Sequence, residues 1–144
     1  MKKFFHLSFI PTSTDLALLV LRLGLGGSML LLHGWAKASK FSSMFDTFPD
    51  PLGIGNKASY LLATGGEIVG SLLLLLGLFT RFAALWLAIV MGVAFTMAHN
   101  MVLRGPGSGE LALIFLVGFV TLFLAGAGRF SLDAKTGARR ALPG

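Results

Sequence analysis

The chain has 144 residues, of which 55% are hydrophobic and 12% are charged, and its net charge is +6 at pH 7. Its mean hydropathy is +0.82. Soluble globular domains carry about 25% charged residues, so this composition excludes a water-soluble particle and predicts an integral membrane protein. The chain has no cysteine, which excludes disulfides, thiolate nucleophiles and cysteine-ligated iron–sulfur clusters.

Four apolar segments are long enough to cross a bilayer as helices, which takes about 20 residues each. Either Thr14 or Asp15 is expected to cap the first of them. The second and third form one long apolar run that Gly77 divides, and the fourth follows the breaker run 105–109. The four segments cover residues 16–35, 58–78, 82–99 and 110–127.

These segments predict an all-α fold. Short connections make successive helices antiparallel, so we expect one transmembrane domain over residues 1–144, folded as a four-helix antiparallel bundle. The loop after the first span predicts a short interfacial helix that ends at Pro49. The residues that form its apolar face are Phe41, Met44, Phe45 and Phe48.

The basic residues predict the orientation, because cytoplasmic loops are enriched in Lys and Arg. With the N-terminus inside, seven basic residues near the span ends lie on the cytoplasmic side and four on the other. We therefore expect a multi-pass protein of the cell inner membrane with both termini cytoplasmic. Scattered basic residues without interleaved aromatic residues do not indicate nucleic-acid binding. Trp35 and Tyr60 are expected to anchor the helices at the membrane interface.

Ionisable groups at membrane depth are costly and are functional candidates by default. Counting about 1.5 Å per residue from the span ends puts Arg22 and Glu67 within about 5 Å in height. We therefore predict an ion pair between them near the bilayer midplane. His33 shares a helical face with Arg22, and further polar residues gather at the outer span ends. The predicted pocket consists of Arg22, His33, Glu67, His99 and Glu110, with Lys37 and Asn100 as secondary members.

These residue types fit more than one role. Arginine, glutamate and histidine beside an apolar wall suit a quinone, whose carbonyls accept hydrogen bonds while His and Glu exchange protons. The same groups suit a small polar solute, and the Arg22–Glu67 pair alone would suit a structural clasp. The sequence contains no phosphate-binding loop, nucleophile elbow or metal-ligand spacing. It therefore assigns no catalytic residue and no metal site.

Several segments resemble the DoxX family, which includes the DoxD subunits of thiosulfate:quinone oxidoreductase. The matching segments are Leu21-Arg22-Leu23, His33-Gly34 with Lys37, Gly66-Glu67, residues 76–84, Glu110 and residues 126–133. One departure is Ala127, where the family usually has proline. The resemblance implies four transmembrane helices and association with membrane-linked redox systems, in which the small subunit works with others. It does not imply that this chain is catalytic.

The leading hypothesis is a small membrane subunit of a quinone-linked or redox-protective system. Quinone is then the expected ligand, without a covalently bound cofactor, and the expected partners are the lipid bilayer and other membrane subunits. One alternative is a non-enzymatic structural or assembly subunit of a larger complex. Another is a carrier for a small solute, although no inverted repeat is detectable in the sequence.

Overall fold

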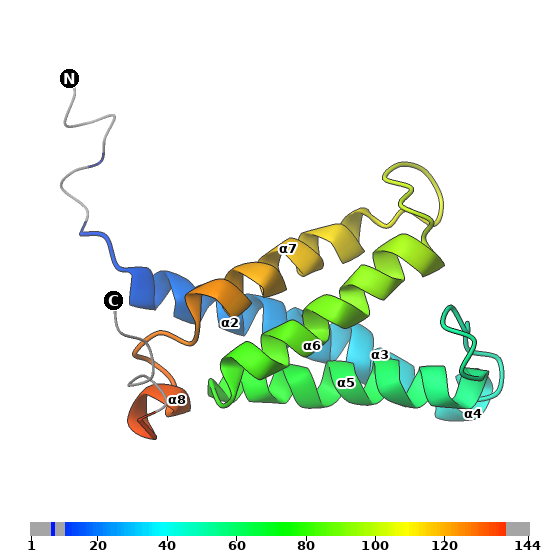
Figure 1. The fold of residues 1–144 in the computed structure, drawn as a ribbon, viewed down its shortest axis with the longest axis horizontal. Coiled ribbons are helices and arrows are strands. Elements are labelled where there is room, and N and C mark those ends of the chain that lie inside the picture. Colours follow the sequence, from blue (N-terminus) through cyan, green and yellow to red (C-terminus); the bar gives the residue numbers. More distant parts are fainter. Residues whose placement is uncertain (1–6, 8–10, 138–144) are drawn as a thin grey trace.

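The computed structural model describes residue 7 and residues 11–137, and this part of the chain is helical without strands. The elements are α2 (Thr14–Ser28), η1 (Met29–Gly34), α3 (Trp35–Ala38), α4 (Phe41–Met44), α5 (Asn56–Leu76), α6 (Thr80–Val93), η2 (Ala94–Ala98), α7 (Glu110–Ala125) and α8 (Leu132–Lys135) (Figure 1). Both η elements are π-helical and continue the α-helices beside them. The predicted all-α class is confirmed.

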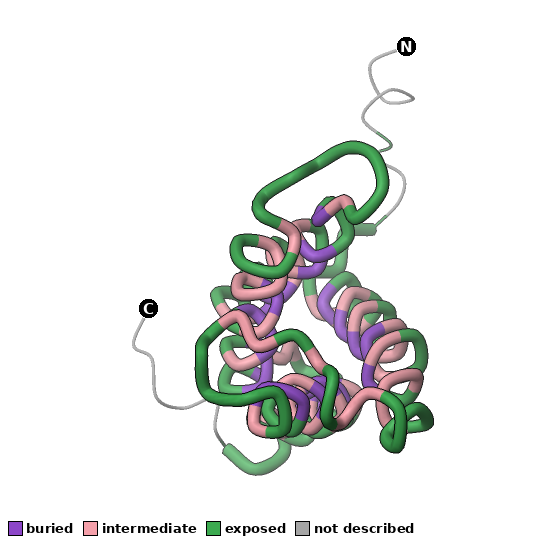
Figure 2. The backbone as a smooth tube through the Cα atoms, turned by 90° about the vertical axis from the view of Figure 1, so that its right-hand side faces the viewer, coloured by how far each residue is buried: buried purple, intermediate pink, exposed green. Residues whose placement is uncertain are grey.

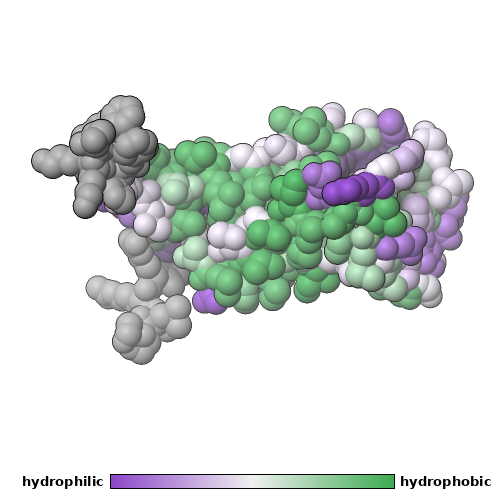
Figure 3. Space-filling view, turned by 90° about the horizontal axis from the view of Figure 1, so that it is seen from above, coloured by the Kyte–Doolittle hydropathy of each residue, from purple (hydrophilic) through white to green (hydrophobic). Residues whose placement is uncertain are grey.

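Three continuous helices are long and apolar enough to cross a membrane, namely Thr14–Ala38, Asn56–Leu76 and Thr80–Ala98. The fourth, α7, is apolar but has 16 residues, or about 24 Å at 1.5 Å per residue. That length falls short of a hydrocarbon core of about 30 Å. On the face seen in Figure 3, apolar side chains cover the middle of the molecule and hydrophilic ones gather at one end.

The four long helices pack around a shared apolar core. α5 lies against α2 and α6, and α7 lies against α6 and α2. The inward faces of these helices carry the buried residues, and their outer faces are exposed (Figure 2). The most deeply buried apolar side chains are Met29, Leu74, Ala84, Leu87, Phe119 and Leu122.

The turn between α5 and α6 lies where the sequence predicts it. Gly77 adopts a left-handed conformation with a φ of 65°, which favours glycine. The amide of Leu78 bonds the carbonyl of Leu73, and the amide of Gly77 bonds that of Leu74. These two bonds form a Schellman motif, which satisfies the last carbonyls of the helix and reverses the chain.

The two ends of the molecule are built from different elements. The α8 end holds the start of α2, the α5–α6 turn and α8, and the α4 end holds α3, α4 and the loop after η2 (Figure 1). At the α8 end, Ser13 caps α2 by accepting a bond from the Leu16 amide, in place of the expected Thr14 or Asp15. At the α4 end, the predicted interfacial helix is reduced to the four residues of α4.

Candidate functional site

A cavity of about 300 Å³ lies between α5, α6 with η2, and the loop that precedes α5. We call it the α5–α6 cavity. Its walls are mainly apolar, and the ionisable side chains among them are Lys37, Glu67 and His99. Ligand pockets of about 300–1,000 Å³ with apolar walls and a few polar groups are typical of small-molecule sites. The α5–α6 cavity is at the small end of that range.

An ion pair forms part of the cavity wall. Lys37 Nζ donates to Glu67 Oε1 at 2.5 Å, and the Glu67 side chain is only 2% exposed. The second carboxylate oxygen, Oε2, is buried and has no hydrogen-bond partner. An unpaired buried acceptor costs about 1–3 kcal/mol. Glu67 therefore contributes to the cavity wall a carboxylate with one unpaired oxygen.

Tyr60 holds α3 and α4 on the end of α5. Its hydroxyl donates to the Lys37 carbonyl at 2.9 Å, and its ring contacts Phe41, Phe45 and Phe48 edge-on. Tyr60 is 2% exposed, so its predicted role as an interfacial anchor is wrong. The contact instead fixes the backbone that carries the Lys37 side chain.

Two of the residues that line the cavity, Lys37 and His99, follow π-helical turns in the chain. η1 leads into α3 with Lys37, and η2 leads directly to His99. Such turns are rare and frequently mark functional sites. His99 Nδ1 lies 2.7 Å from the Gly107 carbonyl. Because a carbonyl only accepts hydrogen bonds, Nδ1 carries a proton, and in the neutral tautomer Nε2 is then an acceptor.

The loop that closes the cavity is held by Asp50. Its carboxylate accepts bonds from the Ser59 hydroxyl at 2.7 Å and from the amides of Ile54 and Gly55. The Ser59 bond, supported by the backbone amides, lowers the pKa of Asp50 below its ordinary value. Neighbouring loop residues line the cavity, namely Phe48, Pro49, Pro51, Leu52 and Ile54.

Arg22 does not pair with Glu67, so the predicted ion pair is wrong. Its guanidinium donates to the carbonyls of Ala127 at 2.9 Å and Phe130 at 2.7 Å, at the α8 end. Helical side chains lean toward the N-terminus of their own helix. Arg22 on α2 therefore leans toward the α8 end, and Glu67 on the antiparallel α5 leans toward the α4 end. The prediction rested on the heights of the two residues along their helix backbones, which do not include the opposite lean of the two side chains.

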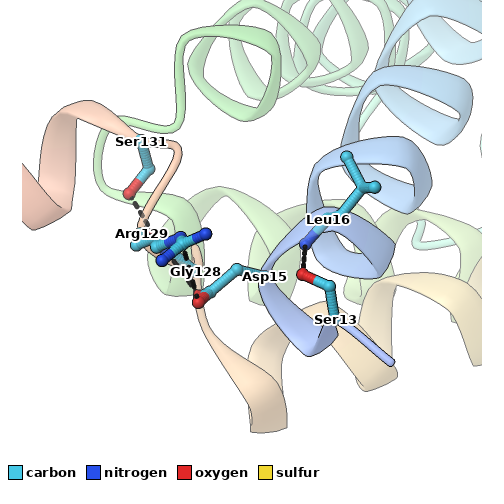
Figure 4. Close-up of polar contacts among 6 residues, drawn as sticks. All are labelled: Ser13, Asp15, Leu16, Gly128, Arg129 and Ser131. Carbon is cyan, nitrogen blue, oxygen red and sulfur yellow. Dashed lines mark hydrogen bonds and ion pairs between the residues drawn. The ribbon is translucent and has the colours of Figure 1, made fainter. Parts of the chain in front are cut away.

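Arg22 belongs to a network that we call the α8 clasp, together with Asp15, Arg129 and Asp133. Asp15 Oδ1 accepts from the Arg129 amide at 2.8 Å, and Asp15 Oδ2 lies 3.5 Å from Arg129 Nε (Figure 4). Asp133 caps α6 by accepting from the backbone amides of Phe79 and Thr80, at 2.8 and 2.9 Å. A cavity of about 660 Å³ adjoins the clasp, and both carboxylates on its wall take part in these contacts.

The remaining predicted residues lie outside the α5–α6 cavity. His33 packs edge-on against Phe115 of α7, with ring centroids 5.4 Å apart. Glu110 is exposed at the start of α7, and Asn100 is exposed in the turn after His99. Of the seven predicted pocket residues, the structure therefore brings Lys37, Glu67 and His99 to one cavity.

The sequence did not single out Trp86, which forms part of the cavity wall. Its indole Nε1 is buried without a partner and packs directly against Gly66. The available signal was the small-residue pair Gly66 and Gly70, which predicts close approach of a neighbouring helix but not which side chain fills the space. In the described part of the chain, no cluster of three or more His, Asp or Glu residues could hold a metal ion.

Comparison with known proteins places the chain in context. Residues 17–100 match the DoxX family model, a range that includes Lys37, Glu67 and His99. An uncharacterized protein of Haemophilus influenzae is 40% identical, over 74% of this chain and 81% of its own length. A second uncharacterized protein of the same organism is 34% identical, over 71% of this chain and 70% of its own length. No solved structure matches the chain.

Proposed function

The chain belongs to the DoxX family, and from the α5–α6 cavity we propose that this small membrane protein binds a quinone dissolved in the bilayer. The observation that carries the proposal is the Glu67 carboxylate, whose Oε2 is unpartnered in an otherwise apolar cavity wall. A quinone combines an apolar ring with oxygens at its edge. The ring therefore complements the apolar walls of the cavity, and the oxygens complement its few polar groups.

The rim of the cavity supports entry from the lipid. Leu52, Leu62 and Ile89 line the cavity and are 53%, 48% and 55% exposed. Leu62 on α5 and Ile89 on α6 would face the acyl chains, so a ligand dissolved in the bilayer would enter between them without crossing water. A cavity of about 300 Å³ accommodates a quinone ring, and the isoprenoid tail would remain in the lipid.

Lys37 supports binding of the ring oxygens. Its ammonium group has three donors, of which one bonds Glu67 Oε1, and its side chain is 23% exposed. The other donors are available for a quinone carbonyl beside Glu67. His99 lies toward the α4 end of the same cavity, and it would serve proton exchange with the surface.

The wider proposal is a membrane subunit of a quinone-linked or redox-protective system with four spans and cytoplasmic termini. The α4 end and its cavity would then face the outer side of the inner membrane. Because the chain has no cysteine, thiolate-bound redox clusters would belong to other subunits of the complex. Purification in mild detergent followed by identification of bound chains tests this partnership, and a functional monomer would contradict it.

Tryptophan fluorescence tests quinone binding directly, because quinones quench nearby indoles. The chain has two tryptophans, of which Trp86 lines the cavity and Trp35 is 65% exposed on the surface. A Trp35→Phe variant reports from the cavity, and Trp86→Phe serves as the matched control. With a short-chain benzoquinone, we expect saturable quenching of Trp86 and only linear quenching of Trp35. Linear quenching of both reporters would exclude a site in the cavity.

A blocking variant tests whether saturable quenching depends on the space inside the cavity. Ala63 lies in the cavity wall on α5, and Ala63→Phe would place a ring in the space proposed for quinone. In the Trp35→Phe background this variant should abolish saturable quenching. Unchanged saturation would place the quinone elsewhere.

A further inference from the structure

We infer that the α5–α6 cavity binds the quinol form in preference to the quinone, and that Glu67 Oε2 makes the distinction. The inference rests on the proposed quinone site and deepens it. The relevant observation is that Oε2 is buried without a partner while Oε1 is bonded to Lys37 Nζ. The free group beside the ion pair is thus an acceptor.

The quinone and the quinol present different hydrogen-bonding groups to Glu67 Oε2. An ionised carboxylate only accepts hydrogen bonds, and both oxygens of a quinone are also acceptors. A quinone beside Glu67 Oε2 therefore leaves that oxygen unpaired and adds a second acceptor next to it. A quinol hydroxyl donates to Oε2 and still accepts from Lys37, so it satisfies both residues.

The other polar groups of the cavity do not reverse this preference. Lys37 Nζ donates equally well to a carbonyl or to a hydroxyl oxygen. In the neutral tautomer of His99, Nε2 is a second acceptor, since Nδ1 donates to the Gly107 carbonyl. The Trp86 indole would favour a carbonyl, but its Nε1 packs against the α5 backbone at Gly66. The available groups thus call for a ligand that donates.

Sites built to hydrogen-bond a hydroxyl reject analogues that lack it, because their own polar group is left unpaired. We expect the quinol to bind at least about tenfold more tightly than the quinone. Each factor of ten raises the midpoint potential of the bound two-electron couple by about 30 mV. The cavity would therefore hold quinol more firmly than the surrounding lipid pool does.

Calorimetric titration of the purified protein tests the preference with three ligands. These are a short-chain benzoquinone, its quinol under anaerobic conditions, and the dimethyl ether of that quinol. The ether keeps the ring and its oxygens but cannot donate. We expect the quinol to bind at least about tenfold more tightly than either of the others. Because this comparison uses the wild-type chain, it does not depend on the folding of any variant.

The chain provides a matched pair of substitutions, because Glu67 and Glu110 are its two glutamates. A glutamine side chain both donates and accepts, so Glu67→Gln should bring the ratio of quinone to quinol affinity close to one. Glu110 is exposed outside the cavity, so Glu110→Gln should leave the ratio unchanged. A preference that survives Glu67→Gln would overturn the role of Glu67.

The outcomes also separate this inference from the proposed function. Equal affinity for quinone, quinol and ether in the wild type would overturn the preference while leaving a quinone site in place. Failure of both quinone and quinol to bind would overturn the proposed function itself. A quinol preference that the dimethyl ether shares would show that ring chemistry, and not donation to Glu67, decides the affinity.

Discussion

At the scale of single residues, Arg22 is the buried charge that the α8 clasp depends on. It is 1% exposed and donates to two carbonyls of the segment after α7. Arg22→Ala would leave both carbonyls unpaired, so we expect a loss of about 2–5 kcal/mol in the free energy of unfolding. Arg81, whose side chain is exposed and donates to one carbonyl, is the control, with an expected loss of about 1 kcal/mol or less for Arg81→Ala. Denaturation in mixed detergent micelles measures both.

Because Arg22 and Glu67 do not contact each other, substitutions at the two residues are predicted to have additive effects on stability. Residues that share no partner usually show stability effects that add within about 0.5 kcal/mol. We therefore expect Arg22→Ala and Glu67→Gln to be additive in a double-mutant cycle. Lys37→Met and Glu67→Gln should instead be coupled, because Lys37 Nζ bonds Glu67 Oε1. Strong coupling of Arg22 to Glu67, comparable with that of Lys37, would contradict the observed geometry.

Asp50 predicts a dependence of stability on pH. Its pKa in the folded protein is lowered from an ordinary value of 3.8, first by the Ser59 hydroxyl. A lowered carboxyl pKa contributes stability that is complete well above 3.8 and is lost as the pH falls through the folded value. Asp50→Asn should therefore lower Tm at pH 7, and the difference from wild type should shrink below pH 3.8.

Asp46 is the matched control for this experiment. It pairs with Lys57 at 3.1 Å, but both side chains are more than 60% exposed, and such surface pairs contribute little. Asp46→Asn should leave Tm nearly unchanged at every pH. A constant Tm difference between wild type and Asp50→Asn from pH 7 to pH 3 would show that the Asp50 charge plays no part.

The candidate site shows how far residue types can be interpreted from sequence. Glu67 was predictable as a functional candidate because ionisable groups within apolar segments are rare, and Lys37 was a secondary candidate because polar residues gather at the outer span ends. The pairing of Glu67 with Lys37 was not predictable from depth alone. Depth favoured Arg22, but the side chains of Arg22 and Glu67 lean in opposite directions because their helices are antiparallel. The roles of Asp50 and Trp86 were hidden as well. They depend on how a loop and a neighbouring helix pack, which residue spacing does not encode.

At the scale of helices, close contact of α5 with α6 depends on Gly70. A Cβ atom there would lie 2.9 Å from Cγ of Leu87, which is fully buried. Because Leu87 has no space to move into, Gly70→Ala should cost about 1–3 kcal/mol. Gly65 on the same helix has no neighbour within 4 Å of the position that a Cβ atom would take. Gly65→Ala should leave the free energy of unfolding unchanged or raise it by up to about 1 kcal/mol, and equal losses would contradict the packing.

The helices themselves were largely predictable, and their irregularities were not. Hydropathy locates long apolar helices because every backbone group in lipid must bond within its own helix. The π-helical segments η1 and η2 lie inside segments predicted as regular. α4 is shorter than its apolar spacing predicts, because Phe41, Phe45 and Phe48 gather around Tyr60 rather than along one flat face. Such features follow from tertiary contacts.

At the scale of the whole molecule, the segments that resemble the DoxX family divide between the two ends. Arg22, the α5–α6 turn and residues 126–133 meet in the α8 clasp. Lys37 and Glu67 meet in the wall of the α5–α6 cavity near the α4 end. The first group joins the helix ends and the second leaves an unpartnered carboxylate oxygen. This division favours a structural role for the clasp and a binding role for the cavity.

The absence of cysteine allows the membrane topology to be tested without background labelling. We propose four spans with the α4 end outside, so single cysteines at Ser42 and Val102 should react with an impermeant maleimide on intact cells. A cysteine at Thr136 should react only after the membrane is permeabilised. Val102 and Thr136 lie on either side of α7, whose 16 residues make it the shortest of the long helices. Labelling of both from the same side would show that α7 does not cross the membrane, and the reverse pattern at all three positions would invert the proposed orientation.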